Sequence, residues 1–201
     1  MGKRVVIIAS GETERRALPH LLRHLKDEGI DIVEVVVPPG SRNLDVDMAV
    51  RLIQARWGYW FQRQQIIDKF VVLVDTDGNN PQAVLQPFHA NLRQRLGTNV
   101  TASLQFAYAQ QHLEAWYFAD EQKLRKALGR DLGQVNPSMP DQINNPKQHL
   151  SNLLKSVSPG HQYTARESEE IARQLDPQII AGRSPSFQSF VDAVRNGASV
   201  A

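Results

Sequence analysis

Uninterrupted apolar runs are the clearest pattern in the first half of the chain. One run, F-V-V-L-V, spans 70–74, and another, V-V-I-I-A, follows Arg4. Both have the length and the β-branched content of strands, and neither alternates between apolar and polar positions. Strands of this kind are buried on both faces, which predicts a parallel sheet between layers of helices.

In most of the remaining chain, apolar residues recur at the spacing of an α-helix. We predict strands at 3–9, 31–37, 70–74 and 99–108. We predict helices at 15–28, 46–69 (in two pieces), 81–96, 110–120, 121–128, 147–157, 164–175 and 185–195. This order predicts an α/β fold, with a parallel-rich sheet flanked by helices and a helical C-terminal part. We expect one domain over 1–201, with the sheet core at 1–128 and a helical extension at 129–201.

The composition narrows the classes of function. The chain has 201 residues and no cysteine, which excludes disulfides and thiolate metal sites. No apolar run approaches the roughly 20 residues that span a bilayer, and the first residues do not resemble a signal peptide. We therefore expect a cytoplasmic protein with no membrane partner. The net charge of +2, from 23 basic and 21 acidic residues, does not by itself indicate a nucleic-acid partner.

Two aspartates, Asp75 and Asp77, directly follow the run at 70–74, and turn residues at 78–81 end the strand. While the chain stays extended, side chains at i and i+2 point the same way, so both carboxylates would share one face. Such a pair needs a positive group between its members, and a divalent metal is the usual one. In a parallel sheet the loop at 10–14 would lie at the same edge. Two solvated acids in a turn are the alternative.

Two enzyme classes use D-x-D-G after a buried strand. In phosphatases of the haloacid-dehalogenase type, Asp75 would be the nucleophile and Asp77 the general acid and base. These enzymes need a further acidic pair downstream, and the later sequence has no such element. In the TOPRIM-type site of nucleases, primases and topoisomerases, an acid after the first strand and a later D-x-D together hold Mg²⁺. The chain has both parts in that order.

Further short motifs extend this likeness along nearly the whole chain. The motifs are S-G-E-T-E at 10–14, V-D-T-D-G at 74–78, H-L-E-A-W at 112–116, P-K at 146–147 and S-P-S-F at 184–187. With them the chain resembles the TOPRIM-like proteins of unknown function that are related to the TOPRIM domains of OLD-type nucleases and are often associated with phage-defence loci. The resemblance implies a TOPRIM-like fold and Mg²⁺ or Mn²⁺ as cofactor. It also implies that Asp75, Asp77 and Glu14 are metal ligands and that Glu114 is a further ligand or base.

The first motif departs from the family pattern, E-G-x-T-E. Ser10 stands where the family has its main glutamate, whereas Gly11, Thr13 and Glu14 match. A serine hydroxyl binds Mg²⁺ only weakly and supplies neither charge nor a base at neutral pH. Either Glu12 or Glu14 substitutes, or the site binds metal or nucleotide without cleavage. A favourable charge in the first turn of a helix explains Glu14 equally well.

The remaining candidates rest on weaker patterns. Spacing alone makes Glu114 a surface residue of an amphipathic helix and His112 a structural histidine, and only the resemblance gives Glu114 a role in the site. Arg15, Lys147 and Arg183 are candidate contacts to a substrate phosphate, although an isolated cation is usually a solvated surface residue. We expect the aromatic group at 57–61 to lie in the core rather than to form a platform for nucleic-acid bases.

Together these patterns favour metal-dependent hydrolysis of phosphodiester bonds in nucleic acid, with Glu14 and Glu114 as catalytic residues. One alternative is a non-catalytic TOPRIM-like subunit that binds nucleotide or nucleic acid and acts with a partner protein. A small-molecule phosphatase is the other. A glutamate beside the Asp75–Asp77 pair would favour the enzyme, whereas an acid pair facing solvent alone would favour the binding subunit.

Overall fold

The centre of the fold is a sheet of four parallel strands in the order β2-β1-β3-β4. The strands are β1 (Lys3–Ile8), β2 (Ile30–Val36), β3 (Lys69–Asp75) and β4 (Leu104–Ala109). The computed structural model describes residues 2–40, 42–101, 103–129, 131, 138–157, 160 and 162–196. The predicted α/β class and its parallel sheet are confirmed.

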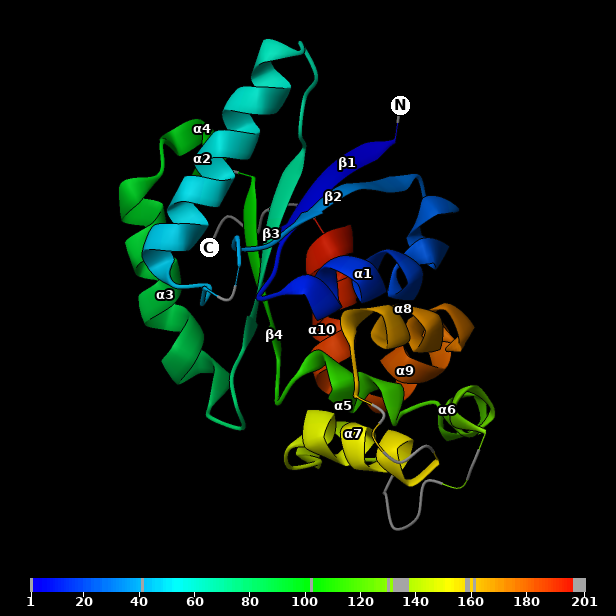
Figure 1. Ribbon diagram of the computed structural model, residues 1–201. Helices are drawn as coiled ribbons and strands as arrows, with labels where there is room; N and C mark the ends of the chain where they lie inside the picture. The colour runs from blue at the N-terminus through cyan, green and yellow to red at the C-terminus, as the bar shows by residue number, and fades with distance from the viewer. Residues whose placement is uncertain are drawn as a thin grey trace.

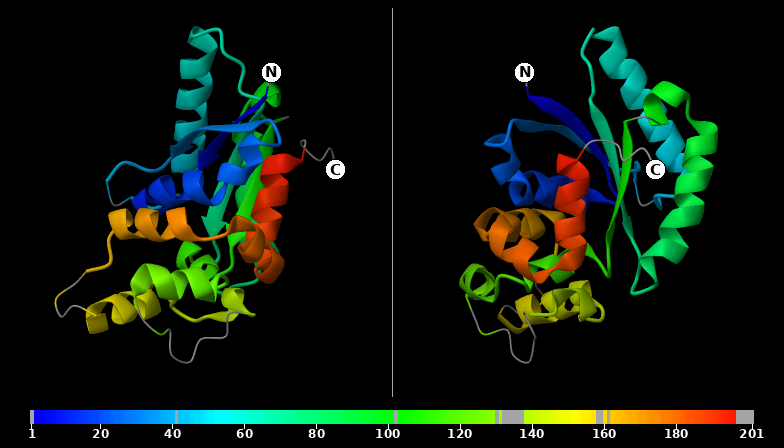
Figure 2. Two further views of the ribbon diagram at one scale, coloured as in Figure 1. Left: turned by 90° about the vertical axis from the view of Figure 1, so that its right-hand side faces the viewer. Right: turned by 180° about the vertical axis from the view of Figure 1, so that it is seen from behind.

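Helices cover both faces of the sheet (Figure 1). They are α1 (Glu12–Leu21), η1 (Arg23–Lys26), α2 (Val46–Gln62), α3 (Pro81–Arg95), α4 (Thr98–Thr101), α5 (Leu113–Tyr117), α6 (Glu121–Leu128), η2 (Pro140–Gln142), α7 (Pro146–Val157), α8 (Ala165–Gln174), α9 (Pro177–Arg183) and α10 (Pro185–Arg195). Helices α2 and α3 lie on one face, and α1 and α10 lie on the other (Figure 2). No helix in the described parts of the chain combines the length and apolar character needed to cross a membrane.

Strand β3 has its alternate side chains in two different cores. Val71 and Leu73 join the core under α1 and α10, whereas Phe70, Val72 and Val74 join the core under α2 and α3. All five are buried. This explains why the run shows no alternation of polar and apolar residues, since neither face of the strand meets solvent.

Several predicted boundaries are wrong for local reasons. The strand predicted at 99–108 begins only at Leu104, because a helical turn, α4, precedes it. In this turn the Thr101 hydroxyl donates to the Thr98 carbonyl, and the Ser103 hydroxyl donates to the Val100 carbonyl. The helix predicted to 69 ends at Gln62 as one piece. Gln64 has a left-handed φ of 55°, which is incompatible with a right-handed α-helix that continues past this residue.

Two further differences concern the second half of the chain. The helix predicted at 110–120 is limited to α5, because the preceding residues are bonded to the turn after β3. Helix α9 has no counterpart in the prediction, although an Asp176 cap and Pro177 at the first position are recognisable start signals. The predicted extension at 129–201 lies partly outside the described residues, and its last helix, α10, packs directly against β3 and β4.

A buried polar network joins two of the sequence motifs. Asp141 of η2 accepts hydrogen bonds from the Ser184 hydroxyl (2.7 Å), the Ser186 hydroxyl (2.8 Å) and the Ser186 backbone N–H (2.8 Å). The Ser186 hydroxyl in turn accepts from Nε1 of Trp116 at 2.8 Å. Because Trp116 is part of α5, the S-P-S-F segment holds α5, and with it Glu114, against α10.

Two lysines hold the other end of α10 in place. Nζ of Lys69, on β3, donates to the Ala193 carbonyl (2.6 Å) and the Val194 carbonyl (3.1 Å). Nζ of Lys3, on β1, donates to the Arg195 carbonyl at 2.8 Å. The last carbonyls of a helix lack partners within the helix, so the two lysines satisfy groups that would otherwise be unpaired.

Replacing Asp141 tests the network. Asp141→Ala leaves two serine hydroxyls and one backbone N–H without their acceptor, so we expect a loss of about 2–4 kcal/mol in the free energy of unfolding. Asp192→Ala is the control, because within the described residues the Asp192 side chain accepts a hydrogen bond only from Gln188 on its own helix. This variant should cost under about 1 kcal/mol. Urea denaturation measures both. Equal effects of the two variants would contradict a special role for Asp141.

Candidate functional site

The turn after β3 is tied to the end of β4. Thr76 N donates to the Ala109 carbonyl (3.0 Å), and Gly78 N donates to the Gln110 carbonyl (2.7 Å). Gly78 has a φ of +77°, and a Cβ there would lie 2.7 Å from Nε2 of Gln111. The Gln111 amide could move aside, but the left-handed backbone itself would strain any side chain here, which favours glycine. The two backbone hydrogen bonds hold the loops after both strands side by side.

The two aspartates occupy different environments at this turn. Asp75 is the last residue of β3, and its side chain is 19% exposed, whereas the Asp77 side chain is 68% exposed. The chain does not stay extended between them, because Asp77 has a left-handed φ of 49°. The expectation of two carboxylates presented alike by an extended strand is therefore wrong.

His112 brings the pair together instead. Its Nδ1 lies 3.5 Å from Oδ2 of Asp75, and its Nε2 lies 3.5 Å from Oδ1 of Asp77. The hydrogen bond with Asp75 raises the pKa of the imidazole, and the charges of Asp75, Glu114 and Asp77 act in the same direction. When protonated, His112 supplies positive charge between the two carboxylates.

Glu14 lies at the same edge, in the first turn of α1. Its side chain is buried, and burial raises its pKa to about 8, with a further contribution from the charge of Asp75. The nearby Glu114 charge also raises this pKa, whereas Lys147 lowers it. A carboxyl group with this pKa holds its proton across much of the neutral range.

Glu114 is a second buried glutamate, placed by the first turn of α5. It is 2% exposed, and burial raises its pKa. Lys147 and His112 oppose this shift, whereas Asp75 adds to it. The prediction of a surface position from helical spacing is wrong for Glu114, because α5 is enclosed by α7, α8 and η2.

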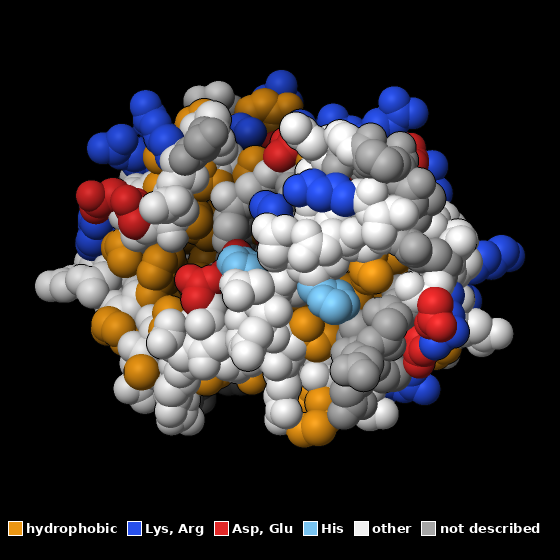
Figure 3. Space-filling model, turned by 60° about the horizontal axis from the view of Figure 1, so that its bottom comes forward, with side chains coloured by type: hydrophobic (Ala, Val, Ile, Leu, Met, Phe, Trp, Pro, Cys, Tyr) orange, Lys and Arg blue, Asp and Glu red, His pale blue; other side chains and the backbone are white. Residues whose placement is uncertain are grey.

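Lys147 stands at the rim of this acidic group. It lines a cavity of about 330 Å³ together with His112 and Tyr163. The Tyr163 hydroxyl is buried and has no partner in good hydrogen-bond geometry among the residues that the structure describes, although Glu114 and Ser168 lie near it. Figure 3 shows acidic and histidine side chains gathered beside a hollow, with Lys and Arg side chains on its other side.

The other predicted candidates lie outside this group. Glu12 is exposed and accepts from Arg15 (2.6 Å) and Arg16 (2.9 Å). Arg15 is therefore held by a carboxylate of its own helix. Arg183 donates to the Ala119 carbonyl at 2.8 Å, which ties α9 to the turn after α5.

The structure thus brings together Glu14, Asp75, Asp77, Glu114 and Lys147 of the predicted residues and adds His112. Sequence reasoning treated His112 as structural, yet its place just after β4 follows the same rule that grouped the acids at one edge. Among the residues that the structure describes, no three His, Asp or Glu side chains are grouped in a way that would hold a metal ion.

The raised pKa of Glu14 makes a pH-dependent contribution to stability. Its value of about 8 in the folded chain exceeds the ordinary 4.5, so folding retains a proton that the unfolded chain releases as the pH rises through this window. The metal-free wild type should therefore lose stability from about pH 5 to pH 8. Glu14→Gln lacks this loss, and its stability relative to wild type should rise by a few kcal/mol over the same range.

Urea denaturation in EDTA at both pH values measures this difference. Glu12→Gln is the matched control, because Glu12 is exposed and its pKa is lowered by Arg15. A difference between Glu14→Gln and wild type that does not change with pH would contradict the burial of an easily protonated carboxyl group.

Comparison with solved structures places the fold among known ones. The C-terminal region of the Burkholderia pseudomallei OLD protein is similar, with a TM-score of 0.51 and 15% identity over 97% of this chain and 98% of that one. The C-terminal region of the Xanthomonas campestris pv. campestris OLD protein has a TM-score of 0.50 and 15% identity over 96% and 94% of the two chains. At this identity the likeness concerns the fold.

Sequence comparison gives a family but no activity. No curated protein matches the chain. A family model described as "Domain of unknown function (DUF4276)" matches residues 10–195, which include all the residues of the site. The chain therefore belongs to the DUF4276 family.

Proposed function

We propose that the chain hydrolyses phosphodiester bonds in nucleic acid with Mg²⁺ or Mn²⁺, as a TOPRIM-type nuclease. The grouping of Glu14, Asp75 and Glu114 at the carboxyl edge of the sheet carries the proposal, because burial, together with the charges of Asp75 and Glu114, raises the pKa of Glu14 to about 8. Carboxylates that are costly to ionise together are stabilised by a cation. The fold shared with OLD C-terminal regions supports the same class by analogy. A place in phage defence rests on the family resemblance alone.

The donor set suits a hard divalent cation. The cluster offers carboxylate oxygens and no thiolate, which is the chemistry of a Mg²⁺ or Mn²⁺ site. Mg²⁺ keeps several waters and commonly binds proteins through only one or two carboxylates. Asp75 and Glu14 would hold the ion, and Asp77 or Glu114 would join as a further ligand only after side chains shift, because no three such side chains are grouped around one point among the described residues. When bound, the ion supplies an activated water and stabilises charge on the phosphate.

The chain's own residues would position the substrate and manage protons. Lys147 is the favoured phosphate contact, because Arg15 is paired with Glu12 and Arg183 is bonded to the Ala119 carbonyl. The buried Glu14 and Glu114 have raised pKa values, which suits groups that exchange a proton near neutral pH. His112 would keep Asp75 in place through its Nδ1 contact.

A non-catalytic binding subunit is the second candidate. His112 lies 3.5 Å from each aspartate, where a cation would otherwise be needed. Ser10 stands where the family pattern has a glutamate. A domain of this kind would bind nucleotide or nucleic acid through Lys147 and leave cleavage to a partner protein.

Metal binding distinguishes these two functions. Calorimetry with Mn²⁺ should detect binding to the wild type in the micromolar to low-millimolar range, and Asp75→Asn should abolish it. Asp27→Asn, on an exposed residue that precedes the amino end of β2, at the other edge of the sheet, should bind as the wild type does. No binding to the wild type would exclude the metal enzyme and favour the binding subunit.

Cleavage assays test the reaction itself. With single-stranded DNA, double-stranded DNA and RNA in Mn²⁺ or Mg²⁺, we expect cleavage that Asp75→Asn lowers at least about 100-fold. Lys147→Met should weaken substrate binding and retain affinity for Mn²⁺, because Lys147 contacts phosphate rather than metal. Metal binding without cleavage of any of these substrates would direct the proposal to a different phosphate ester.

A further inference from the structure

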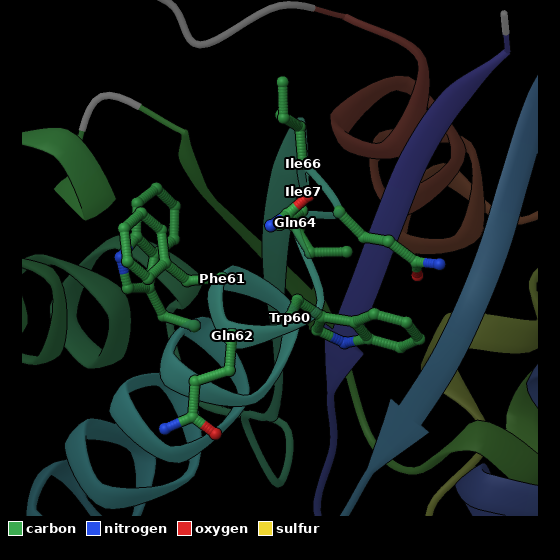
Figure 4. Close-up of a pocket in the computed structure, with 8 residues that line it drawn as sticks. Trp60, Phe61, Gln62, Gln64, Ile66 and Ile67 are labelled. Carbon is green, nitrogen blue, oxygen red and sulfur yellow. The ribbon is translucent and has the colours of Figure 1, made fainter.

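A second cavity lies at the end of the molecule opposite the acidic cluster. It has a volume of about 550 Å³ and is lined by the end of α2 and the segment that enters β3, including Trp57, Trp60, Phe61, Ile66 and Ile67. Figure 4 shows Phe61 and Trp60 projecting to different sides of the last turns of α2, with Ile66 and Ile67 on the segment beyond.

The aromatic group on α2 is only partly in the core: Trp57 and Trp60 pack against the core under α2 and α3, as predicted, whereas Tyr59 and Phe61 are exposed. Phe61 is 75% exposed, Ile66 is 77% exposed and Tyr59 is 39% exposed. The end of α2, which carries Phe61, extends past the amino ends of the strands (Figure 1), whereas Trp57 and Trp60 still contact Phe70 of β3 and Arg4 of β1. Large apolar side chains gathered at an exposed cavity mark an interaction surface.

Arginines line the edge of this surface. The Arg63 guanidinium lies 3.7 Å from the centre of the Tyr59 ring, and the Arg4 guanidinium lies 4.8 Å from the centre of the Trp60 ring. Arg4 is held in place by its hydrogen bond to Oε1 of Gln65 at 2.9 Å. Within the part of the chain that the structure describes, no carboxylate pairs with Arg63.

We propose that this surface binds a segment of a partner protein that carries apolar anchor residues next to Asp or Glu. The apolar cavity would take the anchors, and Arg63 and Arg4 would face the acids. Aromatic and arginine side chains are the residues that most often dominate such interfaces. The positive rim selects an acidic sequence over a basic one.

Two other occupants fit the surface less well. A second copy of the chain, docked about a two-fold axis, would bring the same arginines of both copies together. A nucleic acid draws its affinity from several phosphate contacts, and the cations here are few. Arg56 is paired with Glu34 at 3.0 Å, and Asp68 adds negative charge beside Arg4.

The surface is independent of the proposed active site. Residues 64–67 precede β3, whereas Asp75 ends it, and a strand of this length separates its two ends by about 20 Å. A partner bound at the amino end therefore leaves the acidic cluster open. The docking proposal consequently stands or falls separately from the proposed hydrolysis.

Peptide selection tests the proposal. A random peptide library displayed on phage is selected on the wild type, and the enriched peptides are made synthetically. We expect them to share apolar anchors next to Asp or Glu and to change the fluorescence of Trp57 and Trp60 on binding. Phe61→Ser/Ile66→Ser and, separately, Arg63→Glu should each weaken binding at least about tenfold.

Ile179→Ser is the matched control, because Ile179 is also an exposed apolar residue but lies on α9. It should bind the peptides as the wild type does. The replaced side chains are exposed, so all variants should fold, which circular dichroism verifies. Failure to enrich any such peptide, or enriched peptides that bind the double variant equally well, would overturn the proposal.

If nucleic acid or a second copy of the chain occupies this surface instead, the measurements will differ from those expected for a peptide. Oligonucleotide binding that quenches Trp57 and Trp60 and is lost in the double variant would assign the surface to nucleic acid. Dimerisation of the wild type in sedimentation, lost in the double variant, would assign it to a second copy. Either result replaces the acidic partner segment.

Discussion

The parallel pairing of β3 with β1 on one side and β4 on the other is the constraint on which the rest of the structure depends. Since all four strands run the same way, every loop that follows a strand emerges at one edge. The loop before α1, the turn after Asp75 and the start of α5 therefore meet there. The acidic cluster is a consequence of this direction rather than of any contact between its members, which repel one another.

The charged side chains at this edge are positioned by helices whose packing contacts lie elsewhere in the fold. Glu114 is carried by α5, whose Trp116 is bonded to Ser186 and through it to Asp141. Glu14 is carried by α1, which packs along α8. The energy that fastens these helices comes from apolar burial and satisfied polar groups, and it offsets the cost of enclosing two carboxyl groups. Lys147 contributes opposing charge, and so does His112 when it is protonated.

The two ends of the sheet differ in chemistry for the same topological reason. At the carboxyl end, three loops converge and bring polar side chains together. At the amino end, α2 extends past the strands, and its last turns expose Phe61 instead of burying it. One end thus suits a charged ligand, whereas the other suits an apolar segment. The fold shared with the OLD C-terminal regions, at 15% identity, concerns this scaffold and not the side chains at either end.

The sequence by itself determined the class of the fold and most of the residues at the acidic edge. Continuous apolar runs at 5–9 and 70–74 imply strands buried on both faces, and the edge rule then groups Glu14 with Asp75. Local hydrogen bonds set element boundaries that the periodicity of apolar residues could not predict. One example is the turn that replaces the start of the strand predicted at 99–108.

Only the tertiary structure decided the environment of each side chain. Glu114 is buried because helices distant in sequence enclose α5. Phe61 is exposed because the end of α2 extends beyond the amino ends of the strands. His112 lies between Asp75 and Asp77 because the turns after β3 and β4 are bonded to each other. The burial and charge of a side chain depend on neighbours that are far away along the chain. The local pattern of apolar and polar residues does not identify these neighbours.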